Sequence, residues 1–135
     1  MDENTIATSV LDRCFMIHRR IGPGVFKSIY EEILAFELHR AGLTFQRQVA
    51  MPLKYETLSF DLAFRVDLIV EDKVIVELKS IESILGVHKK QLLNYLRLTG
   101  LHLGLLVNFN SALLRDGIVR VVNQLPVDSL RSPRP

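Results

Sequence analysis

Two carboxylates and a lysine, Asp67, Glu77 and Lys79, lie in consecutive apolar segments that alternate with the period of β-strands. Successive strand residues point to opposite sides of a sheet, so Glu77 and Lys79 share one side of their strand. Carboxylate oxygens are preferred ligands of Mg²⁺ and Mn²⁺. An ammonium group beside them can orient a water molecule and stabilise charge on a phosphate. These residue types therefore predict metal-assisted hydrolysis of a phosphate ester.

A hairpin of residues 63–70 and 73–79 would bring the two carboxylates together. Its apolar side fixes the register, because a slip of one residue turns a whole hydrophobic set to the wrong side of the sheet. Asp67 is then expected directly opposite Glu77, with Cβ atoms about 5 Å apart, where like charges destabilise a sheet unless a cation compensates them. The matching apolar pairs are Val70 with Val74, Leu68 with Val76 and Val66 with Leu78, around a loop at 71–73.

The alternative interpretation is an ordinary charged outer face, in which Arg65, Asp67, Glu77 and Lys79 form diagonal ion pairs. Against it, apolar isoleucines occupy the same side of both strands, and the later helix needs an apolar surface on which to pack. The face is therefore expected to be covered. Covered carboxylates require a metal or a cationic partner.

The surrounding pattern predicts an α/β fold with a mixed central β-sheet flanked by α-helices. A single domain is expected over residues 1–123, followed by a flexible, proline-containing tail over 124–135. Helices are expected at 4–20, 26–41 and 86–98, strands at 63–70, 73–79, 101–109 and 117–122, and one or two edge strands around a turn at 44–64.

Composition narrows the class of protein. The 135-residue chain contains one cysteine, Cys14, so no intramolecular disulfide can form, and a reducing cytoplasm is the expected location. The acidic N-terminus lacks the pattern of a secretory signal, and the apolar runs are far shorter than the roughly 20 residues of a membrane span. The formal charge of +2 permits a nucleic-acid partner without requiring one.

Five sequence blocks, in this order, resemble the GxxExxxR proteins of the PD-(D/E)xK nuclease superfamily over roughly residues 6–122. The blocks are Ile21 to Glu31, Arg65 to Leu68, Val76 to Lys79, His88 to Leu96 and Gly104 to Phe109. The resemblance implies a mixed sheet flanked by helices and metal-dependent phosphodiester hydrolysis. It also implies that Asp67 and Glu77 bind Mg²⁺ or Mn²⁺ and that Lys79 is the catalytic lysine.

Further site residues are expected on the third helix. Gln91 matches a polar residue that supports the site in the superfamily. His88 and Tyr95 lie at helical spacing from Gln91 and therefore share its face.

The chain departs from the namesake motif. Lys27 stands where the pattern has glutamate, and Glu31 stands where it has arginine. Glu31 lies one turn after Lys27 and can reach the same region, so it is expected to replace the missing acid. Equally, a lysine near Asp67 can neutralise the acids without a metal.

Three hypotheses follow. The first is a metal-dependent nuclease, with DNA favoured over RNA as substrate and with Glu31 and Gln91 as auxiliary residues. The second is an inactive nuclease fold that serves as a nucleic-acid-binding or protein-interaction module. The third is a homodimeric scaffold that uses the strand at 101–109 or the first helix as its interface.

Overall fold

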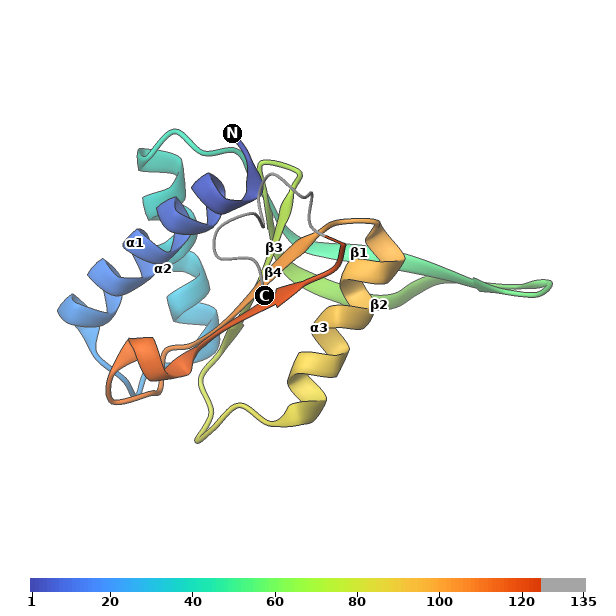
Figure 1. Ribbon diagram of the computed structural model, residues 1–135. Helices are drawn as coiled ribbons and strands as arrows, with labels where there is room; N and C mark the ends of the chain where they lie inside the picture. Colours follow the sequence, from blue (N-terminus) through green and yellow to red (C-terminus); the bar gives the residue numbers. More distant parts are fainter. Residues whose placement is uncertain (125–135) are drawn as a thin grey trace.

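The computed structural model describes residues 1–124 and contains three helices and a five-stranded mixed sheet (Figure 1). The sheet order is β1-β2-β3-β4-β5; β3 and β4 are parallel, and the other neighbours are antiparallel. This confirms the predicted α/β fold. Within the described residues, no helix combines the length and apolar character needed to cross a membrane. The elements are α1 Glu3–Ile21, α2 Lys27–Arg40, β1 Phe45–Tyr55, β2 Leu58–Val70, β3 Val74–Lys79, α3 Gly86–Thr99, β4 Leu103–Asn108, the 3₁₀ helix η1 Leu114–Gly117 and β5 Ile118–Val122.

Capping residues close the start of α1 and the end of α3. The Asp2 carboxylate accepts a hydrogen bond from the Thr5 N–H at 2.8 Å and so caps α1. At the C-terminal end of α3, Gly100 has a φ of 76°, a left-handed conformation that glycine adopts without steric cost. All three helices lie within two residues of their predicted bounds. The predicted tail lies outside the described residues from residue 125 onward.

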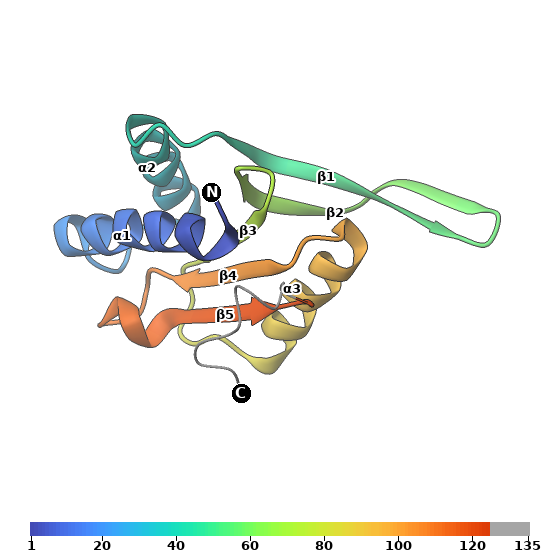
Figure 2. The same ribbon diagram turned by 45° about the horizontal axis from the view of Figure 1, so that its top comes forward.

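Helices cover both faces of the sheet (Figures 1 and 2). α1 and α2 pack on one face and form the larger core with alternate residues of β2, β3 and β4. α3, which joins the parallel strands β3 and β4, packs on the other face over a smaller core. Buried members of the larger core include Ile6, Val10, Tyr30, Leu34, Leu68, Leu78 and Phe109, and those of the smaller core include Val66, Ile69, Ile75, Leu92 and Leu106.

The central hairpin adopts the predicted register in its first part. Val70 pairs with Val74 and Leu68 pairs with Val76. The predicted third pair, Val66 with Leu78, is wrong: Val66 belongs to the core under α3, whereas Leu78 belongs to the core under α1 and α2. Strict alternation therefore fails at the residue between Val66 and Leu68, which is Asp67.

β1 and β2 form a long hairpin whose far end extends beyond the rest of the molecule (Figure 2). The strands expected around a turn at 44–64 are present, but only β1 is an edge strand, because β2 pairs with both β1 and β3. β2 begins at Leu58, earlier than predicted, because its first residues are exposed and are held by backbone pairing with β1, which a hydrophobic pattern does not record. β4 is hydrogen-bonded on both sides, to β3 and β5. The strand at 101–109 therefore has no free edge through which two copies of the chain could pair, which removes strand pairing there as the interface of the hypothetical homodimer.

Candidate active site

Asp67 and Glu77 are joined by hydrogen bonds that cross between β2 and β3. The Asp67 N–H donates to Glu77 Oε2 at 2.6 Å, and the Leu78 N–H donates to Asp67 Oδ2 at 2.9 Å. Each carboxylate thus binds a backbone group at the point where the strand pairing ends, beyond Leu68 and Val76. Both side chains belong to buried residues, with exposed fractions of 4% for Asp67 and 6% for Glu77. The two acids are neighbours through these contacts instead of forming a simple cross-strand pair.

The second oxygen of Asp67 faces the start of α2. Lys27 Nζ lies 3.0 Å from Asp67 Oδ1. The lysine side chain is 42% exposed, whereas that of Asp67 is 6% exposed, so the ammonium enters the site from its solvent side. The lysine that departs from the namesake motif therefore makes an ion pair with one of the predicted metal ligands.

The segment between α1 and α2 sets the position of Lys27. Gly22 has a φ of 77°, which allows the sharp turn after α1. The Tyr30 hydroxyl donates to the Gly22 carbonyl at 2.6 Å and accepts from the Val25 N–H at 3.2 Å. The Ser80 hydroxyl donates to the Val25 carbonyl at 2.8 Å, which ties this segment to the end of β3.

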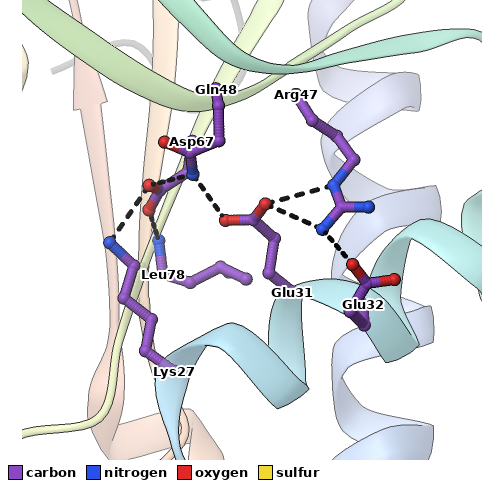
Figure 3. A network of polar contacts seen from close by, with 7 residues as sticks. All are labelled: Lys27, Glu31, Glu32, Arg47, Gln48, Asp67 and Leu78. Atoms are coloured by element: carbon purple, nitrogen blue, oxygen red, sulfur yellow. Dashed lines mark hydrogen bonds and ion pairs between the residues drawn. The ribbon is translucent and has the colours of Figure 1, made fainter.

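A glutamine links Asp67 to Glu31 (Figure 3). Gln48 Nε2 donates to Glu31 Oε1 at 2.8 Å and to Asp67 Oδ1 at 3.2 Å. Arg47 Nε donates to the other Glu31 oxygen at 3.1 Å, and a second guanidinium nitrogen lies 2.9 Å from Glu32 Oε1. Glu31 is buried and reaches the site, as expected, although its contact with Asp67 runs through Gln48.

Arg47 and Gln48 are site neighbours that the sequence pattern did not identify. Gln48 has a φ of 49°, a left-handed conformation uncommon for a residue with a side chain. It lies between two regular pairs, Arg47 with Leu68 and Val49 with Val66, so β1 is distorted opposite Asp67. A glutamine within a proline-containing edge strand carries no periodic signal, and only the pairing of β1 with β2 reveals its place.

The electrostatic environment of Glu77 favours its protonated form. Burial, followed by the negative charge of Asp67, raises the pKa of Glu77 to about 7. The hydrogen bond from Asp67 and the positive charges of Lys27 and Lys79 act in the opposite direction. Lys79 is half-buried, and its positive charge is close enough to Glu77 to lower the pKa of that carboxyl.

α3 closes the opposite side of the acid pair. Tyr95 is buried and stacks on Phe64 with ring centroids 4.2 Å apart. Burial, followed by the charges of Glu77 and Asp67, raises the pKa of the Tyr95 hydroxyl, and a hydrogen bond with Gln91 lowers it. Gln91, predicted as a site residue, is exposed on the helix and meets the site through Tyr95.

His88, on the same helix face as Gln91, has a local role in the helix. Its Nδ1 accepts a hydrogen bond from the Leu85 N–H at 2.9 Å, which caps the start of α3.

The family model for the PD-(D/E)XK nuclease superfamily matches residues 4–121. The chain belongs to the PD-(D/E)XK nuclease superfamily. The match spans almost all of the three α-helices and of the sheet, including each acid and lysine of the candidate site. The superfamily typically uses divalent metals, and its nuclease domains suggest a nucleic-acid partner. Comparison with curated proteins finds no match.

The side chains of the site agree in part with a superfamily metal centre. Asp67 and Glu77 offer buried carboxylate oxygens, the donor type that Mg²⁺ and Mn²⁺ prefer, and these ions often take only two carboxylates together with water and phosphate oxygens. Across residues 1–124, no group of three or more histidine, cysteine, aspartate or glutamate side chains is arranged to hold a metal ion. Glu31 bonds to Gln48 and Arg47 and so does not complete such a group.

Proposed function

We propose that this chain is a divalent-metal-dependent nuclease that hydrolyses phosphodiester bonds of nucleic acid, with DNA the favoured substrate. Within the superfamily we place it with the GxxExxxR proteins. The observation that carries the proposal is the buried pair Asp67 and Glu77, held together by hydrogen bonds of 2.6 and 2.9 Å, with Lys79 beside it. Burying two adjacent acids is costly unless a cation compensates them.

In the proposed mechanism Asp67 and Glu77 hold Mg²⁺ or Mn²⁺. Such an ion, when bound, polarises a phosphate oxygen and lowers the pKa of a bound water molecule. The Leu78 N–H and Gln48 fix the orientation of the Asp67 carboxylate, and the Asp67 N–H fixes that of Glu77. Ligand orientation of this kind supports the affinity and activity of a metal site.

Lys79 is the proposed catalytic lysine. It lies two residues beyond Glu77 on the same side of β3, so its ammonium can orient the attacking water and stabilise charge that develops on the phosphate. Glu31 is a positioning residue, because it acts on Asp67 through Gln48. We propose the same class of role for Gln91, which acts through Tyr95.

A second candidate function is a nuclease fold without hydrolysis that binds nucleic acid or protein. The ion pair between Lys27 and Asp67, at 3.0 Å, favours it, because an internal ammonium can compensate the acids in place of a metal. The two candidates differ in whether the purified protein binds Mn²⁺ at these acids and cuts nucleic acid.

Cleavage assays on single-stranded and double-stranded DNA and on RNA test the proposal. Wild-type protein with Mn²⁺ is expected to cut at least one of these substrates, and Glu77→Gln, Asp67→Asn and Lys79→Met are expected to lose that activity. The matched control is Asp12→Asn, an exposed acid of α1 remote from the site. If wild type leaves all substrates intact, or if Glu77→Gln cuts as well as wild type, the proposal is wrong.

A further inference from the structure

We infer that the Lys27 ammonium competes with a divalent cation for Asp67, so that metal binding requires Lys27 to leave its ion pair. The inference rests on the proposed function, because it concerns the same metal site and names how that site is regulated. Its physical basis is that the ammonium contacts Asp67 Oδ1, an oxygen of one predicted metal ligand, while the backbone N–H of the same residue donates to Glu77, the other.

The exposure of the two partners allows such an exchange. The Lys27 side chain is 42% exposed, and that of Asp67 is 6% exposed. The lysine therefore reaches inward from the surface on a long, flexible stem, and it can swing out to water without opening the core. Asp67 has no such freedom, because the Leu78 N–H and Gln48 also hold it.

The position of Lys27 is unfavourable for the helix that carries it. Lys27 is the first residue of α2, whose first turn contains no acidic residue and whose N-cap, Phe26, makes no side-chain capping bond. A positive charge at a helix N-terminus opposes the helix dipole. The carboxylate of Asp67 compensates this charge, so the ion pair, and not the needs of the helix, accounts for a lysine here.

The hydrogen bonds of the two acids do not depend on Lys27. Glu77 Oε2 accepts from the Asp67 N–H, and Asp67 Oδ2 accepts from the Leu78 N–H. The acids therefore keep their orientation in a closed form with the ammonium in place and in an open form that a cation can enter. When only a fraction of molecules is open, the apparent dissociation constant for metal rises by the inverse of that fraction.

Calorimetric titration with Mn²⁺ tests the inference on wild type, Lys27→Met and Lys27→Gln. Methionine keeps most of the stem without the charge, and glutamine keeps a donor for Asp67, so at least one variant retains the fold, as circular dichroism can verify. Lys54→Met, an exposed lysine of β1 in the distal hairpin, is the matched control.

Both Lys27 variants are expected to bind Mn²⁺ at least about tenfold more tightly than wild type. This gain is expected if the wild-type site is open in less than about a tenth of the molecules. Lys54→Met is expected to match wild type, and adding Asp67→Asn to Lys27→Met is expected to abolish the gain. Equal affinity in wild type and in the folded Lys27 variants overturns the inference, as does undetectable binding in all of them.

These outcomes separate the inference from the proposed function. If the Lys27 variants bind Mn²⁺ more tightly but neither they nor wild type cut any nucleic acid, the competition stands and the nuclease proposal falls. If wild type cuts nucleic acid and the Lys27 variants bind Mn²⁺ no more tightly than wild type, the nuclease proposal stands and the competition falls.

Discussion

Lys27 Nζ lies 3.0 Å from Oδ1 of Asp67, so a lysine from the first turn of α2 meets an acid on the central hairpin. The superfamily core is retained around this contact, and the second acid, Glu77, accepts a hydrogen bond from the backbone N–H of Asp67. The site thus carries its own cation beside a pair of potential metal ligands. The stability and chemistry of the protein should both depend on how that pair is compensated.

Asp67→Ala should destabilise the protein more than Asp67→Asn. Alanine leaves the buried N–H of Leu78 without an acceptor, which costs about 1–3 kcal/mol, whereas the asparagine carbonyl can keep that bond. Both variants lose the ion pair with Lys27, so its loss does not distinguish them. Urea unfolding measures the difference. Equal free energies of unfolding for the two variants would show that the Leu78 bond has no structural role.

Glu77→Gln should change how stability depends on pH in metal-free protein. The pKa of Glu77 is raised from 4.5 to about 7, so between these values the folded protein binds a proton that the unfolded chain releases. Wild type should therefore lose stability relative to Glu77→Gln as the pH rises through this window, with no further change above it. Unfolding curves in EDTA at several pH values provide the measurement, and a stability difference that grows in favour of wild type would contradict it.

Gly104→Ala should loosen the packing of α3 on the sheet. A Cβ at this position would lie 2.8–2.9 Å from three atoms of the Leu92 side chain, so this side chain or the helix that carries it must shift. A destabilisation of about 1–3 kcal/mol is expected from such overpacking. Gly86→Ala, where a Cβ meets nothing within 4 Å, is the matched control and should be neutral or stabilising. A Gly104→Ala variant as stable as Gly86→Ala would mean that α3 is not held closely against β4.

Cys14 should be unreactive in the folded protein. The side chain is fully buried on the core-facing side of α1, and burial raises the pKa of its thiol to about 12, so almost no thiolate exists at neutral pH. A thiol reagent should label the native protein very slowly and the urea-unfolded protein at once. Rapid labelling without denaturant would show that α1 opens readily from the sheet.

Much of the frame around the site could be predicted from the sequence, because each prediction rested on a local or periodic signal. Alternation in the hairpin gave the pairs Val70 with Val74 and Leu68 with Val76. Apolar residues at helical spacing located the helices, and glycines near their C-terminal ends marked where they stop. The same signals brought Asp67 and Glu77 together, although strict alternation predicted a direct cross-strand pair where the structure has hydrogen bonds between side chain and backbone.

The remaining features of the site depend on contacts that have no signature along the chain. Gln48 joins Glu31 to Asp67 only because β1 pairs with β2 and is distorted at that residue. The ion pair of Lys27 depends on how the turn at Gly22 directs α2 toward the sheet. The sequence pattern suggested a lysine near Asp67 but not which oxygen of the carboxylate the ammonium would contact.

A crystal structure of the full chain soaked in Mn²⁺, with anomalous scattering recorded, tests the central proposal most directly. We expect one anomalous peak about 2.0–2.3 Å from oxygens of both Asp67 and Glu77, with Lys27 Nζ displaced from its place 3.0 Å from Asp67 Oδ1. A difference map without a peak at these acids, with the lysine still in contact with Asp67 at saturating Mn²⁺, would contradict a metal-dependent active site in this protein.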